Sequence, residues 1–132
     1  MTPDTTDWTE LREFKDVALT RSFVLSWHVE GGDLVLDLDL CLEPSHPFYE
    51  QPRRSQGDCI RPALLKFPAC KRLVTGVRDA HEAVDTVASR IGHGRIAGLE
   101  RSGEGRYKLR GDFGTVTIDG GRPLLRLGNG PA

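Results

Sequence analysis

The fold class is decided by the stretch Leu34-Val35-Leu36-Asp37-Leu38-Asp39-Leu40-Cys41-Leu42. Leucine occupies every even position, while the odd positions hold valine, aspartate or cysteine. Successive side chains of a β-strand point to opposite faces, and no helix places these five leucines on one side. The stretch therefore predicts a strand that buries its leucine face and leaves the odd face, with Asp37 and Asp39, in solvent.

A hairpin extends this strand toward the N-terminus. Residues 23–30 alternate in the same way, and Gly31-Gly32 separates the two runs. Paired glycines supply the positive φ angles of a two-residue turn. With these glycines as the loop, the numbers of paired residues sum to 63, and a slip of one residue would break the apolar match. The predicted apolar pairs are Phe23–Leu40, Leu25–Leu38, Trp27–Leu36 and Val29–Leu34.

Two short helices are predicted outside the hairpin. Residues 8–13 follow a capping-box pattern at Asp7 and Glu10. Residues 79–91 form an amphipathic helix, with Gly92 as its stop. The apolar residues on one face are Trp8, Leu11 and Phe14 in the first segment, and Ala80, Ala83, Val84, Val87, Ala88 and Ile91 in the second.

Further short strands complete the predicted fold. They lie at residues 59–67, 71–77, 95–100, 106–110, 115–118 and 123–127. About seven short strands with one central helix predict a mainly β, α+β fold, either an antiparallel β-sandwich or a strongly curved sheet. The length of 132 residues suits a single domain, residues 1–132.

Composition and charge limit the setting. Residues 1–46 carry ten acidic and three basic side chains, net −7, and residues 47–132 carry nine and fifteen, net +6. Since neither part has a dense charge block, we favour acidic and basic strands that neutralise each other over a nucleic-acid surface. No apolar run approaches the roughly 20 residues that span a bilayer, so no membrane partner is expected. The acidic N-terminus and three cysteines without a Cys-x-x-Cys pair predict a cytoplasmic protein with free thiols.

Three pieces of the chain resemble a known group of proteins. They are Trp8…Leu11…Phe14, the run from Leu19 to Trp27, and the run from Arg110 to Gly114. Together they resemble a family of small uncharacterised bacterial proteins and, more distantly, the β-rich immunity proteins of bacterial toxin systems. The resemblance implies a cytoplasmic bacterial protein that binds another protein. It transfers no catalytic residue.

Motifs that carry chemistry are incomplete. Residues 92–97 match G-x-G-x-x-A, but they follow a predicted helix and enter a strand, which reverses the context of a dinucleotide site. His81 and Asp85 lie one helical turn apart without an evident third ligand. Asp37 and Asp39 would need a cleft to act in acid–base catalysis. We therefore expect no catalytic residue, no metal site and no cofactor.

The basic and thiol side chains receive a structural interpretation. Arg106, Lys108 and Arg110 share one strand face, and no aromatic residue stands beside them for base stacking. We therefore expect acidic strands, rather than nucleic acid, as their partners. Cys41, Cys59 and Cys70 have no neighbouring base and are predicted to be structural.

The predicted binding surface is the loop of residues 43–58, which three prolines stiffen. Aromatic and arginine side chains dominate interface energies, and the loop presents His46, Phe48, Tyr49, Arg53 and Arg54. The alternative is that Phe48 and Tyr49 fold back over the end of the sheet. The functional hypothesis is a non-enzymatic protein-binding domain, immunity-like, that uses this loop or the acidic strand face. The alternative is a small enzyme or ligand-binding domain with its site between the sheet and the helix.

Overall fold

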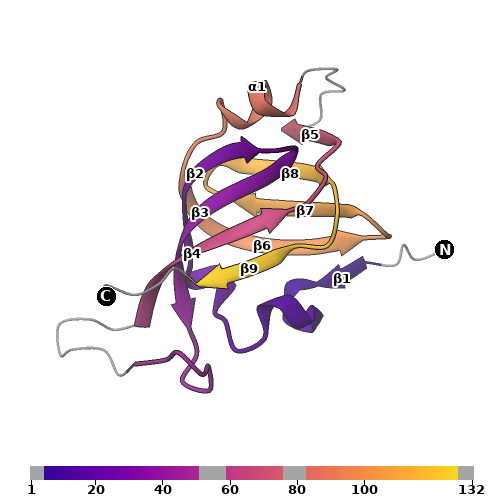
Figure 1. The fold of residues 1–132 in the computed structure, drawn as a ribbon. Helices are drawn as coiled ribbons and strands as arrows, with labels where there is room; N and C mark the ends of the chain where they lie inside the picture. The colour runs from indigo at the N-terminus through magenta and orange to yellow at the C-terminus, as the bar shows by residue number, and fades with distance from the viewer. Residues whose placement is uncertain (1–4, 51–58, 76–82, 128–132) are drawn as a thin grey trace.

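The structure is a computed structural model, and it describes residues 5–50, 59–75 and 83–127. As predicted, the described chain is mainly β, and its nine strands join into one antiparallel sheet (Figure 1). The strands are β1 (Thr5–Asp7), β2 (Phe23–Glu30), β3 (Asp33–Leu42), β4 (Cys59–Phe67), β5 (Arg72–Thr75), β6 (Gly94–Ser102), β7 (Arg106–Gly111), β8 (Gly114–Asp119) and β9 (Leu124–Leu127). The helical segments are the 3-10 helices η1 (Trp8–Glu10), η2 (Arg12–Phe14) and η3 (Leu19–Arg21), and the α-helix α1 (Val84–Ala88).

β6 joins two layers of the sheet. Strand order is β5-β8-β7-β6-β2-β3-β4-β9, with β1 paired to β6. The start of β6 pairs with β2, its remainder pairs with β7, and a bulge between Ile96 and Gly98 interrupts the second pairing. The layer of β2, β3, β4 and β9 therefore lies over that of β6, β7 and β8 (Figure 1). Of the two predicted architectures, the structure has the strongly curved sheet, and in its described part the sheet stays open between β5 and β9.

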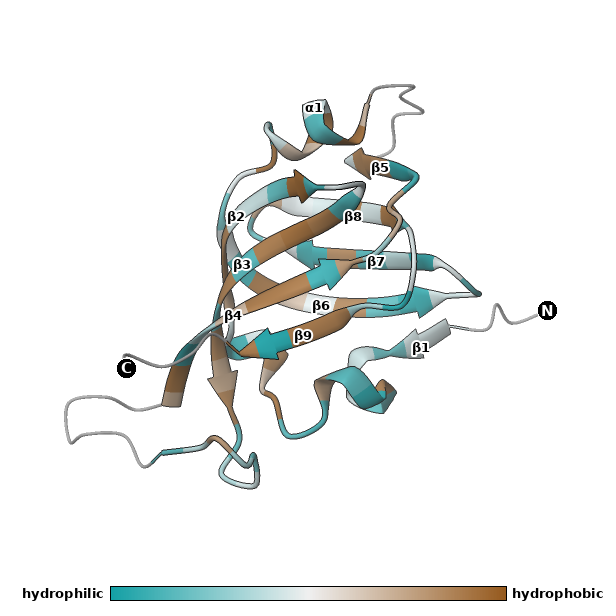
Figure 2. Cartoon of the chain, in the orientation of Figure 1, coloured by the Kyte–Doolittle hydropathy of each residue, from teal (hydrophilic) through white to brown (hydrophobic). Residues whose placement is uncertain are grey.

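The core lies between these two layers. Both layers contribute apolar side chains to it, and the apolar stretches of β3 and β4 are visible in Figure 2. Removal of such side chains from water is the dominant favourable term in folding. The largest fully buried side chains are Phe67, Leu19, Leu34, Leu36, Leu38, Leu40, Leu65, Leu73, Ile96, Leu99, Leu109 and Ile118.

The predicted hairpin register is confirmed next to the turn. Val29 pairs with Leu34, and Trp27 pairs with Leu36. The glycines of Gly31-Gly32 have φ angles of 55° and 86°, in the left-handed region that glycine adopts without steric cost. The turn chemistry thus sets the pairing for the first half of the hairpin.

Farther from the turn, the predicted pairs Phe23–Leu40 and Leu25–Leu38 are wrong, because β2 contains a bulge. Val24, rather than Leu25, pairs with Leu38. Val24 is consequently fully buried, whereas Leu25 is 47% exposed. On its other edge, this part of β2 also pairs with β6, and the alternation of residues within β2 does not encode that second pairing.

The odd-numbered face of β3 is solvated only in its middle. Asp37 and Asp39 are partly exposed, but Val35 and Cys41 are buried, so the prediction of a solvated face holds only for the two aspartates. Near Cys41, the segment between η2 and β2 pairs with the edge of β3. The backbone N–H of Ala18 donates to the Cys41 carbonyl at 2.9 Å, next to an antiparallel bridge between Val17 and Leu42.

The N-terminal lid consists of η1 and η2, separated at Leu11, rather than the single helix predicted over residues 8–13. Asp7 caps η1 as predicted, since its carboxylate accepts a hydrogen bond at 3.2 Å from the backbone N–H two residues on. Leu11 and Phe14 are buried, and Trp8 packs against the core.

The central helix α1 is shorter than the predicted span of 79–91. It begins at Val84, and the part of the prediction before residue 83 lies outside the described residues. It ends at Ala88, before Gly92, the predicted stop. The Ser89 hydroxyl donates to the Thr86 carbonyl at 2.7 Å, and such side-chain bonds compete with helix continuation. The last two residues of α1 are buried, as the predicted apolar face requires, and the helix contacts β2 and β5.

Candidate functional site

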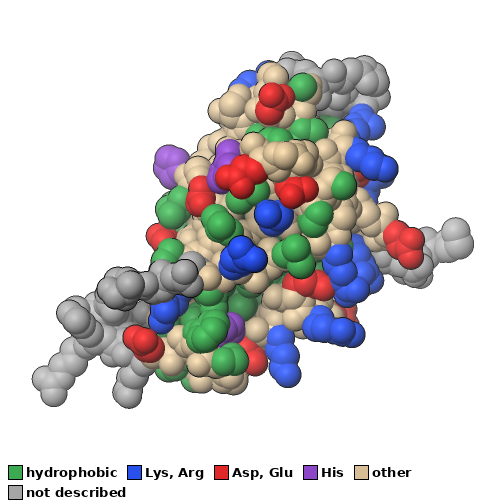
Figure 3. Space-filling model, in the orientation of Figure 1, with side chains coloured by type: hydrophobic (Ala, Val, Ile, Leu, Met, Phe, Trp, Pro, Cys, Tyr) green, Lys and Arg blue, Asp and Glu red, His purple; other side chains and the backbone are tan. Residues whose placement is uncertain are grey.

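The outer face is the solvent side of β2, β3, β4 and β9, and it gathers exposed apolar side chains. Of the five large hydrophobic side chains exposed in the described part of the chain, four lie on this face: Leu25, Ile60, Leu64 and Leu124. The exposed Pro62 lies between Ile60 and Leu64 on the same side of β4. Figure 3 views this face, where hydrophobic side chains reach the surface among charged ones. Clustered exposed apolar groups with polar surroundings mark interaction sites.

The strand register distributes the charged side chains of the outer face unevenly. Asp37 of β3 pairs with Leu64 of β4, and Leu64 pairs with Arg126 of β9. Asp39 lies on the same side of β3 as Asp37, and Lys66 lies on the same side of β4 as Leu64. The acids are therefore grouped over β3 and the bases toward β9, with the apolar side chains between them.

Some of these charges are already engaged. The Ser26 hydroxyl donates to Asp37 Oδ2 at 2.5 Å, and Lys66 Nζ lies 3.9 Å from Asp33 Oδ2. Asp39, in contrast, makes no hydrogen bond or ion pair with any described residue. The outer face thus presents a carboxylate that the described fold does not use.

A hollow of about 430 Å³ opens in the outer face between β2, β3 and β4. The bulge that turns Leu25 outward forms one wall of it, and β4 forms the other. Its lining is mostly apolar, with the Asp37 and Ser26 side chains as the polar groups. The lining residues are Leu25, Ser26, Asp37, Leu38, Pro62, Ala63 and Leu64.

The predicted binding loop lies beside this face, and the structure describes its first half. Phe48 is 58% exposed, whereas His46 is partly buried and its Nδ1 accepts the Phe48 N–H at 3.0 Å. Tyr49 packs against the core, which is the alternative weighed for it from the sequence. Arg53 and Arg54 lie outside the described residues. Binding by this loop stays a prediction.

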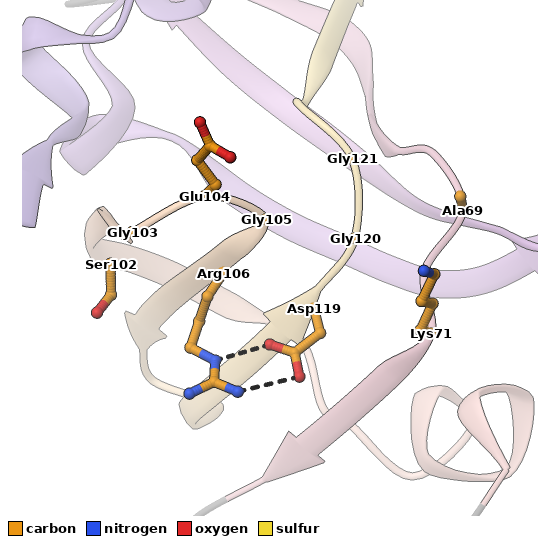
Figure 4. Close-up of a pocket in the computed structure, with 10 residues that line it drawn as sticks. All are labelled: Ala69, Lys71, Ser102, Gly103, Glu104, Gly105, Arg106, Asp119, Gly120 and Gly121. Carbon is orange, nitrogen blue, oxygen red and sulfur yellow. Dashed lines mark hydrogen bonds and ion pairs between the residues drawn. The ribbon is translucent and has the colours of Figure 1, made fainter.

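A second hollow, of about 640 Å³, lies where the β6–β7 turn meets the segment after β8 (Figure 4). In it Arg106 Nε lies 2.8 Å from Asp119 Oδ1, and Arg106 Nη2 lies 3.4 Å from Asp119 Oδ2. The bond to Asp119 raises the pKa of the Arg106 guanidinium above its ordinary value. The predicted partner for this basic strand, an acidic neighbour, is confirmed at Arg106. The pair neutralises itself, and four glycines line the same hollow, which makes it a poor candidate for chemistry.

An ion pair holds the N-terminal lid to the sheet. Arg122, before β9, places Nε 2.6 Å from Oε1 of Glu13 in η2. The second oxygen of Glu13 is buried without a hydrogen bond to the described residues. Tyr107 is buried in the core near this pair, and burial raises the pKa of its phenol. These groups connect two segments distant in sequence, and we assign them a structural role.

The glycine motif of residues 92–97 also has a structural role. It follows α1 and enters β6, so the reversed context inferred from the sequence is confirmed. A Cβ on Gly94 would lie 2.5 Å from Asp112 Cβ, and the Asp112 carboxylate accepts the Arg95 N–H at 3.0 Å. The glycine therefore permits β6 to approach the β7–β8 turn.

The remaining chemical candidates are not assembled into a site among the described residues. Cys41, Cys59 and Cys70 are buried and form no disulfide with a described residue, and burial raises the pKa of the Cys70 thiol to about 11. The described part holds no group of three or more histidine, cysteine or acidic side chains that could bind a metal. His81 of the His81–Asp85 pair lies outside that part. None of the described helices has the length and apolar character needed to cross a membrane.

The apolar outer face was missed by the sequence interpretation, although the sequence contains a signal for it. Leu64-Leu65 and Leu124-Leu125 are adjacent leucines within strands. Because neighbouring side chains of a strand point to opposite faces, one leucine of each pair must point away from the core. Leu65 is fully buried, and Leu64 is its exposed neighbour.

Comparisons with protein-family models, curated proteins and solved structures gave no match for this chain. The resemblance to immunity proteins therefore stays a hypothesis. Function is inferred below from the geometry of this chain.

Proposed function

We propose that this chain is a non-enzymatic protein-binding domain that docks another protein on its outer face. The observation that carries the proposal is the exposure of Leu25, Ile60, Leu64 and Leu124 on one side of the sheet. Covering apolar surface contributes about 25 cal/mol for each Å² removed from water. The flanking acidic and basic side chains would fix the orientation of the partner.

The alternative site between the sheet and α1 has less support. The buried residues of α1, Val87 and Ala88, belong to the hydrophobic core. Trp27 fills the adjacent space, where its ring meets Phe113 edge-on at 5.3 Å and its Nε1–H donates to the Gly92 carbonyl at 2.9 Å. Apolar packing of this kind favours a structural contact over a ligand site.

The immunity-like role is part of the proposal. The resemblance of the N-terminal and C-terminal pieces supports a bacterial protein that binds a toxin in the cytoplasm. Buried cysteines that form no disulfide are typical of proteins in a reducing compartment. Under this proposal the toxin is the protein that covers the outer face.

Site-specific photocrosslinking tests the docking surface. A benzoylphenylalanine at position 64 lies in the middle of the outer face, and one at Thr117 lies on the outward side of β8 as the matched control. In cells of the source organism we expect a protein adduct from position 64 and none from position 117. The captured protein, purified separately, should bind the purified wild-type chain.

The proposal is overturned by any of three results. The two positions could give the same adducts, the purified captured protein could fail to bind in solution, or the adduct from position 64 could be a second copy of this chain.

A further inference from the structure

We infer that the docked protein inserts a cationic side chain, arginine or lysine, into the hollow between β2, β3 and β4, and surrounds it with apolar side chains. The inference rests on the proposed function, because it specifies the chemistry of the partner at the outer face. It is drawn from the shape of the hollow, the acidic side chains in and beside it, and the charges that flank it.

The hollow suits a side chain with an apolar stem. The exposed side chains of Leu25 and Leu64 stand on its opposite walls, and Pro62 closes one side. The volume of about 430 Å³ exceeds the size of a single side chain, so neighbouring partner side chains can enter as well. Lysine and arginine pack their methylene stems on apolar surface while the charged head group reaches a polar one.

One acidic side chain, Asp37, lines the hollow, and a second, Asp39, lies next to it outside the lining. Asp37 and Asp39 follow each other on one side of β3, about 7 Å apart along the strand. Asp37 accepts one hydrogen bond from Ser26, and His28 Nδ1 lies 3.6 Å from its Oδ2. Asp39 has no hydrogen-bonding or ionic partner in the described chain, so its carboxylate is open to a partner beside the hollow.

No described lysine or arginine of the outer face forms an ion pair with Asp37 or Asp39. Arg95 of β6 lies on the same side as Asp39, with Phe23 of β2 between them. Arg126 is separated from Asp37 by Leu64 and lies two strands away, about 10 Å across the sheet. Lys66 is directed to Asp33 beside the hairpin turn. The face is therefore acidic over β3 and basic on both flanks, at Arg95 of β6 and at Arg126 of β9, and a partner with a cation opposite β3 matches it.

A cation gains more here than at an open surface. Covering the leucines removes water from around the carboxylates, and an ion pair strengthens as the local dielectric falls. An anionic partner side chain would suffer repulsion from Asp37 and Asp39 and lose its own hydration. The hollow thus selects the sign of the partner's charge.

Three short peptides serve as probes of this selection. They are acetyl-Leu-Arg-Leu-amide, the same peptide with uncharged citrulline in place of arginine, and the same peptide with glutamate. Each is titrated at low salt into the isotope-labelled full chain while backbone amide signals are followed by NMR. We expect saturable shifts at Leu25, Asp39 and Leu64 with the arginine peptide, at least about fivefold weaker binding of the citrulline peptide, and no saturation with the glutamate peptide.

Matched variants assign the effect to the two carboxylates. Asp39→Asn, which disturbs no described contact, should weaken the arginine peptide about fivefold, and Asp37→Asn/Asp39→Asn about tenfold or more. Glu10→Gln/Glu104→Gln removes the same total charge away from the hollow and should leave binding within about twofold of wild type. The inference is wrong if the citrulline peptide binds as well as the arginine peptide, if the control variant matches the test variant, or if no saturable shift arises at the hollow up to about 10 mM peptide.

The protein captured from position 64 separates this inference from the proposed function. If Asp37→Asn/Asp39→Asn leaves its affinity and salt dependence unchanged while Leu64→Glu abolishes binding, docking stands and the cationic side chain is refuted. If Leu64→Glu leaves it bound, docking on the outer face is refuted. Loss of binding in both variants supports both statements.

Discussion

Substitutions at Val24 and Leu25 test the bulge in β2, because uninterrupted alternation and the observed structure predict opposite outcomes. Val24→Ala removes two methyl groups from a fully buried side chain. At about 0.8 kcal/mol for each buried carbon, plus the cavity that remains, we expect a loss of about 1.5–3 kcal/mol. Leu25→Ala trims a side chain that is 47% exposed, so we expect a loss below about 1 kcal/mol.

Urea denaturation followed by circular dichroism measures both losses. Leu36→Ala is the reference, because Leu36 is fully buried and either register places it in the core, and its loss should be about 3–5 kcal/mol. Similar m-values across the series would show that the variants unfold by the same transition. A larger loss for Leu25→Ala than for Val24→Ala would restore the uninterrupted register and refute the bulge.

Three other substitutions or titrations examine the fold elsewhere. Gly111→Ala should destabilise the fold by about 3 kcal/mol or more, because the new Cβ would clash with the Arg95 carbonyl. Gly103→Ala meets open space and should cost only about 1–2 kcal/mol, for a side chain at a left-handed φ. Urea midpoints of the two variants measure the difference. Trp27→Phe should lose about 1–2 kcal/mol with its hydrogen bond, and an unchanged thermal midpoint would contradict that bond. The Cys70 thiol should resist iodoacetamide at pH 9, with a pKa of about 11 in the fold against 9.0 unfolded. Because the pKa of Cys70 is higher in the folded protein than in the unfolded chain, its contribution to the free energy of unfolding is complete below pH 9 and is lost as the pH rises to about 11. Rapid labelling of Cys70 in the native protein at pH 9 would disprove the raised pKa.

The fold class was predictable because the local signals agree with one another. The leucine alternation of β3 and the Gly31-Gly32 turn both specify a hairpin, and the pairing from Val29–Leu34 to Trp27–Leu36 follows. The bulge was not predictable, because it arises where β2 also pairs with β6, a strand far away in sequence. The alternation of residues predicts the register of a strand pair only where no third strand also pairs with one of the two.

For the N-terminal lid, too, the sequence predicted the buried residues but not the backbone geometry. The spacing of Trp8, Leu11 and Phe14 correctly predicted which side chains meet the core. The prediction of one continuous helix over residues 8–13 was wrong, since a six-residue segment has little intrinsic helix stability and tertiary contacts decide its geometry.

The candidate site was only partly within reach of the sequence. Asp37 and Asp39 could be placed on an outward strand face, and that placement is correct. Their apolar neighbours come from β4 and β9, and joining them required the order β3-β4-β9, which no local pattern contains. The hollow depends in addition on Leu25, which points outward only because of the bulge.

The most direct test of docking on the outer face is calorimetric titration of the captured protein into two charge-matched variants, Leu64→Glu and Thr117→Glu. Both add one negative charge to an outward strand position, but only Leu64 lies on the outer face. We predict binding at least about tenfold weaker for Leu64→Glu, as expected for a charge placed in an apolar contact, and unchanged affinity for Thr117→Glu. Equal affinities for the two variants would contradict docking on this face.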